Sequence, residues 1–592
     1  MPAVDRSEIN PAYQWDLSHI CPTVQAWEDL MSRLPPYIYG LRNISGTLGT
    51  SAEAMKAGLD RIFKVRQVVE TAYIYAMLLS SGDNSDPQNQ MMSQRALSWT
   101  TALEEAVAFL PPQILAMEEE KLEEFLKDPA MEEYRHFIEN IRRTGKHTLS
   151  EDNERILALL SEAAATPSET ADMFSDVDLT FPDVVTASGS QLPVTHATFG
   201  VLREDRDRCV RQQAFEQYLG AYRSFENTLA TLYGGSIKLD AFKARVRNYS
   251  GSIDAALDAD NVPVAVYENL IETVRSYLPY MKRYLELRRK ALGVEKLHMF
   301  DLYVPLVPER NEEVSFDQAK EMVLRAVRPF GEEYLGIIRR AFDERWIDVY
   351  ENRGKSAGAF SCGVYGVHPY VLLNFAGRLE DAFTLAHELG HSLHSCFSDA
   401  SQSYVNHEYS IMVAEVASTV NEIMLCRSLL ENSTGLARAS LLNRLLEGFR
   451  TTVFRQTLFA EFEMEAHRMY ESGEPVTAKT LNALYHRLNA IYYPGVELDP
   501  VTDVEWARIP HFYRPFYVYQ YATGYCSAVS IAESVLNGSG AESYLDFLRM
   551  GGSRYPLDEL KEAGVDLEDP GSLKSALDVF AQTVSELQEL WN

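Results

Sequence analysis

Residues 52–80 read AEAMKAGLDRIFKVRQVVETAYIYAMLLS, with apolar side chains returning every three to four positions and no proline between them. This period predicts a long helix with one buried face. Residues 85–87 (Ser-Asp-Pro) then offer a cap and a first-turn proline for a second helix, which should end near Pro111 and Pro112. Ser150 marks another helix start. Further long helical patterns occur at 210–247, 263–292, 316–344, 435–472 and 572–591.

Strand patterns are few, and the chain is therefore predicted to be mainly α. Residues 178–199 (DLTFPDVVTASGSQLPVTHATF) alternate around a Ser-Gly-Ser turn, which is typical of a small hairpin. Residues 359–375 (AFSCGVYGVHPYVLLNF) are rich in aromatic and branched side chains and form a second strand candidate. The pattern of residues in the sequence changes near residue 200. This change predicts an N-terminal, mainly helical region, 1–200, and a second region, 201–592.

The composition is that of an ordinary folded protein with a strongly acidic balance. The 592 residues include 55 Lys and Arg against 85 Asp and Glu, giving a net charge of −30. This balance disfavours nucleic acid and anionic membranes as partners, because both are bound through clustered basic residues. No run approaches the roughly 18 apolar residues of a membrane span. Six scattered cysteines without a CxxC pair, and an N-terminus without signal-peptide features, predict a reducing, cytoplasmic location.

The sequence His387-Glu388-Leu389-Gly390-His391 carries the clearest chemical signal. Histidines four apart lie on one helical face, so both imidazoles can reach a single zinc ion. Glu388 lies beside them and is predicted to be the general base, removing a proton from the water that the metal activates. The alternative is a core helix with two hydrogen-bonded histidines, but burying two histidines and a glutamate without partners is costly.

A catalytic zinc site needs a third protein ligand. His394 lies about 10 Å along the helix from His387, too far to share the ion. The apolar stretch 411–430 contains only two acids, Glu415 and Glu422. Glu415 is the predicted third ligand, and Glu422 could support one of the histidines. A salt bridge at the surface is the alternative for these acids.

Other residues are candidates for the same site. His407 and Glu408 are the fallback ligands if Glu415 fails. Residues 511–525 (HFYRPFYVYQYATGY) contain one histidine and five tyrosines. A tyrosine hydroxyl can donate a hydrogen bond to a tetrahedral oxyanion, although most of these rings could equally be packing groups.

Within that aromatic segment we predict His511 and Tyr519 as oxyanion donors, with Tyr517 and Tyr513 next. An exposed strand edge within 359–375 could bind an extended peptide through main-chain hydrogen bonds, or could be plain sheet packing. The nearby His368 is expected to be structural.

Several segments together resemble oligoendopeptidase F, the bacterial branch of the thimet oligopeptidase-like zinc metallopeptidases. The strongest are AHELGHSLHS at 386–395, VAEVASTVNE at 413–422 and IPHFYRPFYVYQYATGY at 509–525. Further similarities outside the site are WDLSHI at 15–20, DRCVRQQAF at 207–215 and HPYVLLNF at 368–375. The resemblance therefore spans nearly the whole chain.

The resemblance implies a large helical ellipsoid with a deep substrate channel and one small β-sheet beside the zinc helix. It implies one Zn2+ per chain on His387, His391 and Glu415, with Glu388 as general base. The region 201–592 would then be the catalytic region, an endopeptidase for short unstructured oligopeptides. Two alternatives stay open: a carboxypeptidase that uses Arg508 or Arg514 to hold the terminal carboxylate, and a non-catalytic peptide-binding protein.

Overall fold

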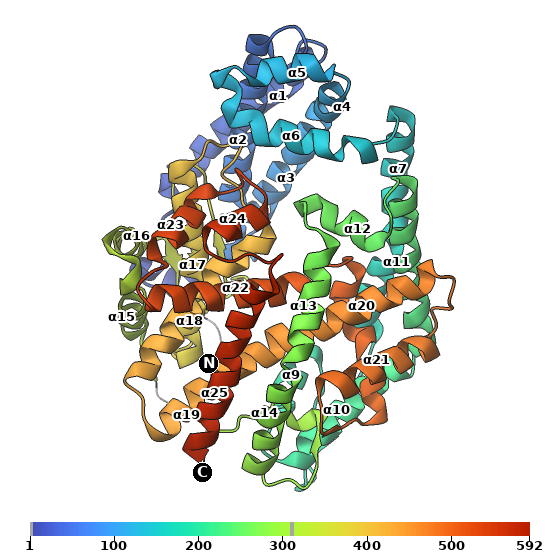
Figure 1. The fold of residues 1–592 in the computed structure, drawn as a ribbon. Coiled ribbons are helices and arrows are strands. Elements are labelled where there is room, and N and C mark those ends of the chain that lie inside the picture. Colours follow the sequence, from blue (N-terminus) through green and yellow to red (C-terminus); the bar gives the residue numbers. More distant parts are fainter. Residues whose placement is uncertain (1–3, 308–312, 592) are drawn as a thin grey trace. The chain divides into compact units, whose positions relative to one another are not determined.

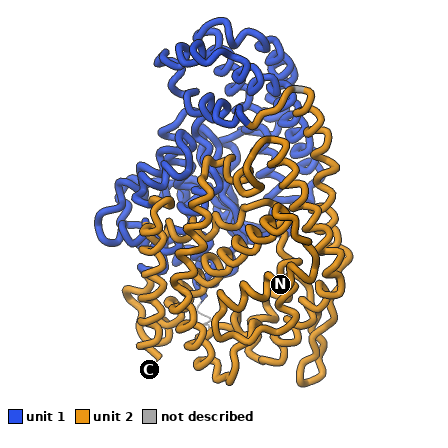
Figure 2. The backbone as a smooth tube through the Cα atoms, turned by 45° about the vertical axis from the view of Figure 1, so that its right-hand side comes forward, with its two compact units in different colours: residues 1–146, 311–428, 531–565 blue, residues 147–310, 429–530, 566–592 orange. Residues whose placement is uncertain are grey.

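The computed structural model describes residues 4–307 and 313–591. This part of the chain forms two compact units, each assembled from three separate segments (Figure 2). Unit 1 contains residues 1–146, 311–428 and 531–565, and unit 2 contains residues 147–310, 429–530 and 566–592. The boundary expected near residue 200 concerns contiguous regions of sequence and stays a prediction.

Helices dominate both units, which confirms the predicted mainly α class (Figure 1). The helices of unit 1 are α1 (Val24–Leu41), α2 (Ala52–Gly82), α3 (Pro87–Val107), α4 (Leu110–Leu115), α5 (Glu119–Leu126), α6 (Arg135–Thr144), α15 (Phe316–Ala326), α16 (Glu332–Asp343), α17 (Leu379–Ser401), α23 (Ala541–Met550) and α24 (Pro556–Glu562).

Unit 2 is built from a second set of helices, and two more helices have residues in both units. Those of unit 2 are α7 (Glu151–Ala164), α8 (Thr166–Met173), α9 (His196–Leu202), α10 (Arg208–Arg223), α11 (Glu226–Val246), α12 (Ser252–Leu257), α13 (Val264–Ser276), α14 (Leu278–Ala291), α19 (Gly435–Gly448), α20 (Arg455–Glu471), α21 (Ala478–Tyr492) and α25 (Pro570–Trp591). The shared helices are α18 (Ile411–Glu431) and α22 (Tyr519–Leu536).

The predicted helix starts are confirmed where capping residues marked them. The Asp86 side chain accepts a hydrogen bond from the Gln88 backbone at 2.8 Å, and Pro87 occupies the first helical position of α3. The helix predicted after Ser150 is α7, although the Ser150 side chain makes no capping hydrogen bond. In α2, the Ser51 hydroxyl accepts from the Ala54 backbone at 3.2 Å.

Three of the long helical patterns are each broken into two helices. Pro279 lies at the start of α14, just after α13 ends at Ser276. Between α15 and α16 come Pro329 and Gly331, whose φ of 89° favours glycine. Phe225 leaves the helical conformation between α10 and α11. The pattern at 435–472 continues through a wider π-helical turn, Phe449–Phe454, that joins α19 to α20.

The strands form three small sheets rather than one. The predicted hairpin is β1 (Val184–Val185) paired antiparallel with β2 (Gln191–Leu192). A parallel pair, β3 (Leu297–His298) with β7 (Val496–Glu497), was not predicted, because two-residue strands are too short to show alternation.

The third sheet lies beside the helix that carries the HELGH sequence. Its strand order is β4-β6-β5, so the fully buried β6 (Tyr370–Leu372) is central and β5 (Phe360–Cys362) is an edge. The short β4 (Ile347–Asp348) pairs parallel to β6. Both β5 and β6 contact α17, which also packs against α15, α16 and α23. None of the helices in the described part of the chain is long and apolar enough to cross a membrane.

A buried ion cluster stabilises the end of β4. Asp348 is 1% exposed, and its carboxylate binds Lys355 Nζ at 2.7 Å and Arg6 Nη2 at 2.5 Å. Lys355 also donates to the Tyr350 carbonyl at 2.7 Å. Burial lowers the pKa of Lys355, although Asp348 opposes this. The N-terminal segment is thereby tied to the sheet that lies against α17.

Replacing Asp348 with asparagine should lower the free energy of unfolding by about 3–5 kcal/mol, because two cations would keep no buried counter-charge. Chemical denaturation followed by circular dichroism measures this loss. The matched control is Asp317→Asn, which removes an exposed ion pair with Lys320 and should cost about 0–1 kcal/mol. Equal stabilities of the two variants would contradict the structural role of the cluster.

Candidate metal centre

Helices α17 and α18 bring three ligand atoms together in unit 1. His387 Nε2 and His391 Nε2 are 3.2 Å apart, and Glu415 Oε2 lies 3.6 and 3.9 Å from them. Ligands of a tetrahedral zinc ion are about 3.3 Å from one another, given bonds of roughly 2.0–2.1 Å. Within residues 4–307 and 313–591 this is the one group of three or more histidine, cysteine, aspartate or glutamate side chains with ligand atoms this close. The donors therefore suit a metal ion.

The two helices approach so closely because Gly390 has no side chain. A Cβ atom at this position would lie 2.5 Å from Ser418 Cα and 2.6 Å from the Ala417 carbonyl oxygen. The buried Asn421 side chain adds a hydrogen bond from Nδ2 to the Ala386 carbonyl at 3.0 Å. Backbone contact and hydrogen bond together fix the position of Glu415 relative to the histidines.

Glu422 orients His387. The Nδ1 hydrogen of His387 is donated to Glu422 Oε1 at 2.7 Å, which leaves the Nε2 lone pair directed at the candidate site. Burial opposes protonation of His387, but the hydrogen bond and the charges of Glu422 and Glu388 raise its pKa to about 9. For His391, burial and the charge of His387 lower the pKa to about 3. Protonated His387 thus places one positive charge among the three ligand atoms, and a bound metal ion would replace that proton.

The Glu388 side chain is less exposed to solvent than those of Glu415 and Glu422. It is 6% exposed, and burial raises its pKa to about 7, with His387 lowering it and Glu415 raising it further. Such a carboxyl group changes its protonation state easily near neutral pH, which suits a group that accepts and then returns a proton.

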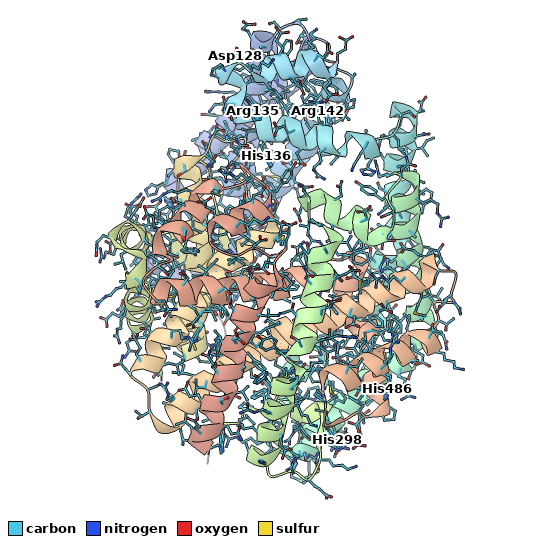
Figure 3. All side chains as sticks on the ribbon, viewed as in Figure 1. Asp128, Arg135, His136, Arg142, His298 and His486 are labelled. Carbon is cyan, nitrogen blue, oxygen red and sulfur yellow. The ribbon has the colours of Figure 1, made fainter. Side chains whose placement is uncertain are left out.

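The remaining histidines have other surroundings. His394 is fully buried and stacks on Tyr409 with ring centres 3.6 Å apart, so it is a core residue, as its spacing suggested. The fallback candidate His407 binds Asp399 at 2.9 Å. Two histidines of unit 2 that Figure 3 labels, His298 and His486, likewise bind single aspartates. The structure gives each of these rings a partner or a packing role outside the ligand group.

In unit 2 the predicted His511 lies in a group of tyrosines. Its Nε2 is 3.2 Å from the Tyr521 hydroxyl, and its ring is parallel to that of Tyr517 at 6.0 Å. The Arg514 guanidinium lies over the Tyr517 ring at 4.1 Å. Burial and Arg514 lower the pKa of His511, so the ring is neutral near pH 7.

The other two predicted tyrosines lie elsewhere in unit 2. Tyr519 is 1% exposed and packs on Tyr267, with burial raising its pKa. Tyr513 packs edge-on against Tyr233. Tyr521, which is not among the predicted donors, is the tyrosine whose hydroxyl lies 3.2 Å from His511 Nε2. Tyr521 lies four residues after Tyr517, and this spacing was the feature of the sequence that could have predicted its place beside His511.

The strand candidate 359–375 contains the edge strand β5. The Ser361 hydroxyl on β5 is 2.8 Å from the Ser392 hydroxyl on α17, so the strand is tied to the histidine helix. His368 is 6% exposed, stacks on Trp346 at 4.5 Å and lies 2.8 Å from His19. Its surroundings are those of a packing residue.

Comparisons with known proteins agree with one another over most of the chain. Residues 201–579 match the model of peptidase family M3, and residues 113–181 match the model of oligopeptidase F. Oligopeptidase PepF of Bacillus subtilis (strain 168) is 40% identical over 99% of this chain and 88% of its own. The group B oligopeptidase PepB of Streptococcus agalactiae is 38% identical over 99% of this chain and 98% of its own.

Solved structures of peptidases are also similar to this chain. Oligoendopeptidase-F from Enterococcus faecium is similar with a TM-score of 0.74 and 36% identity, covering 96% of this chain and 99% of its own. PZ peptidase A is similar in fold, with a TM-score of 0.69 and 15% identity over 98% of this chain and 99% of its own.

Replacing Gly390 with alanine should separate α17 from α18 and lower both stability and the affinity of the site for a metal ion such as zinc. The new methyl group meets backbone atoms that cannot turn away, and overpacking of this kind costs about 1–3 kcal/mol. Thermal denaturation and zinc titration measure the two effects. Gly336→Ala on α16 is the control, because nothing lies within 4 Å of a Cβ there. A Gly390→Ala protein with unchanged zinc affinity would contradict the role of the contact.

Proposed function

Because the chain belongs to peptidase family M3, in its oligopeptidase F group, we propose that it is a zinc-dependent endopeptidase that hydrolyses internal bonds of short, unstructured oligopeptides. The observation that carries the proposal is the triangle of His387, His391 and Glu415 ligand atoms, with sides of 3.2, 3.6 and 3.9 Å. The buried Glu388 lies next to it in the sequence. A cytoplasmic site of action is part of the proposal, and six free cysteines suit a reducing compartment.

His387, His391 and Glu415 would hold one zinc ion. The donor set fits, because catalytic zinc is bound by two imidazole nitrogens and one carboxylate oxygen in known sites, and three protein ligands would leave a fourth position open. When bound, zinc would polarise the scissile carbonyl and lower the pKa of a water molecule. Glu422 keeps the His387 ring in the orientation and tautomer that ligation needs.

Glu388 would move the proton. Its carboxylate takes the proton from the attacking water and gives it to the nitrogen of the leaving amine. The raised pKa supports this assignment, since a carboxyl group that titrates near 7 can both accept and return a proton at neutral pH.

His511 and a nearby tyrosine would donate hydrogen bonds to the oxyanion. The neutral His511 ring and the Tyr521 and Tyr517 hydroxyls form one polar and aromatic group. We favour Tyr521 and Tyr517 over the buried Tyr519, because a hydroxyl that contacts substrate must be reachable. The β5 edge would bind the peptide main chain by strand pairing, which reads no particular side chain.

Replacing Glu388 with glutamine should leave zinc bound and reduce the rate by at least about 10³-fold, because the amide cannot accept the proton. The measurement is cleavage of an internally quenched peptide of about eight residues, blocked at both ends, with zinc content determined in parallel. Glu321→Gln, a change at an exposed glutamate of unit 1, is the matched control and should cleave like the wild type. A Glu388→Gln protein with full activity would refute the mechanism.

The blocked ends decide between the candidate activities. Internal cleavage by the wild type supports an endopeptidase. Cleavage only of peptides with a free C-terminus would favour the carboxypeptidase alternative, for which the exposed Arg514 could hold the carboxylate. Zinc binding without any cleavage would leave a peptide-binding protein.

Replacing Glu415 with alanine should abolish zinc binding, because two histidines alone hold the ion weakly. Replacing Glu422 with glutamine should weaken binding by about 10–100-fold, since only the support of His387 is altered. Zinc content after dialysis against a chelator, with circular dichroism to verify folding, measures both. Stoichiometric zinc in Glu415→Ala would remove that residue from the ligand set.

A further inference from the structure

Unit 2 contains a second cluster of charged side chains. None of its residues is assigned to metal binding. Five arginines of this unit lie beside Tyr303 or share two carboxylates with one another. We call this set the arginine cluster: Arg203, Arg288, Arg450, Arg455 and Arg508.

The first carboxylate of the cluster is Glu447. Its Oε2 accepts a hydrogen bond from Arg450 Nη2 at 2.6 Å, and its Oε1 accepts one from Arg288 Nη1 at 3.1 Å. The Tyr284 hydroxyl donates to the same carboxylate at 2.5 Å. These contacts hold the pKa of Glu447 at about 2 despite its burial. One negative charge is therefore divided between two guanidinium groups.

The second carboxylate is Glu505, and it is divided in the same way. Arg455 Nη2 donates to Glu505 Oε1 at 2.7 Å, and Arg508 Nη2 lies 3.5 Å from that oxygen. Tyr485 donates to the other oxygen at 2.8 Å. Burial would raise the pKa of Glu505, but the two arginines lower it to about 2. Four arginines of the cluster thus share the two negative charges of Glu447 and Glu505.

The side chain of the fifth arginine, Arg203, makes no hydrogen bond or ion pair within the described part of the chain. Its guanidinium carbon lies 3.9 Å from the centre of the Tyr303 ring, and that of Arg450 lies 4.7 Å from the same centre. Arg203 Nε and Arg450 Nη1 are buried donors without a partner. Arg450 itself is 0% exposed.

Such an excess of positive charge calls for an anion. A guanidinium group stays protonated, so it cannot lose its charge on burial as a lysine can. Uncompensated buried charge is strongly unfavourable. The effect is visible at Tyr303, where burial would raise the pKa but Arg455, Arg450 and Arg203 lower it below its usual value. Tyr303 and Arg203 are only half-buried, so a dissolved ion can reach them.

We propose that Arg203 and the Tyr303 hydroxyl bind a small inorganic oxyanion, of which phosphate is the probe, and that this ion balances the charge of the arginine cluster. An oxyanion is favoured over a halide because the planar fork of donors on a guanidinium matches two oxygens of one anion. The site is independent of the proposed peptidase activity, since it uses none of the residues assigned to that reaction.

The first test is thermal denaturation of the full zinc-loaded chain in increasing phosphate at constant ionic strength. The wild-type midpoint should rise with the logarithm of phosphate concentration, as expected for a ligand of the native state. Arg203→Gln should lose most of this rise. Arg487→Gln, at an exposed arginine of unit 2, should keep it. An equal rise in Arg203→Gln and the wild type would overturn the proposal, as would an equal response to chloride.

The second test follows Tyr303 directly and does not depend on the stability of Arg203→Gln. The ultraviolet absorption of the phenolate, taken as wild type minus Tyr303→Phe, should show a tyrosine that ionises at lower pH than usual. Phosphate should move this ionisation to higher pH, because the bound anion opposes a second negative charge. An unchanged titration would overturn the proposal.

The source of the anion is tested with peptides on the inactive Glu388→Gln variant. A peptide with a free C-terminal carboxylate should compete with phosphate no better than its amidated form. Competition by the free acid alone would overturn the inorganic assignment and make the cluster a peptide-carboxylate site.

Discussion

The contact between the backbones of α17 and α18 at Gly390 is the constraint on which the metal centre depends. His387 and His391 share a helix and keep their spacing whatever surrounds them. Glu415 comes from another helix, and its distance from the histidines is set by how closely the two backbones approach. Because metal–ligand bonds vary by only about 0.2 Å, even a small separation of the helices would remove one ligand. The glycine within the HELGH sequence is thus as much a part of the site as the histidines.

The acids around this contact explain why the site favours a cation. Glu388, Glu415 and Glu422 lie near two imidazole rings on α17 and α18. Burial opposes protonation of His387, but the hydrogen bond to Glu422 and the nearby acids raise its pKa to about 9, and burial raises the pKa of Glu388 to about 7. A single positive charge placed among the three converging acceptors relieves the repulsion between them. The same local charge that attracts the ion makes Glu388 a better proton acceptor.

Much of this was available from the sequence, because the decisive patterns are local. Helical periodicity, capping residues and the four-residue spacing of two histidines are properties of short segments. Glu415 could be chosen because an acid on an apolar helix needs a partner. The difference in burial between Tyr519 and Tyr521 arises from the packing of α22 in unit 2. The spacing of these tyrosines from His511 in the sequence does not predict it.

Features that combine distant segments could not be predicted from the sequence. The two-residue strands β3 and β7 show no alternation of their own. The composition of each unit from three segments leaves no mark in composition or linker sequence. The arginine cluster draws on residues from 203 to 508, and each of its members is indistinguishable in the sequence from an ordinary surface charge. Such features arise from tertiary packing and become visible only with coordinates.

The assembly of each unit from separated segments has a consequence for the order in which the protein can be made. Unit 1 contains α23, which packs against α17 through Phe547 beside His394, and Tyr544 donates to the Ala417 carbonyl at 3.4 Å. While the chain grows on the ribosome, α17 is therefore complete some 150 residues before the helix that covers it has been synthesised. During that interval the face of α17 that α23 later covers has no native partner, so unit 1 can complete its native packing only when translation is nearly finished.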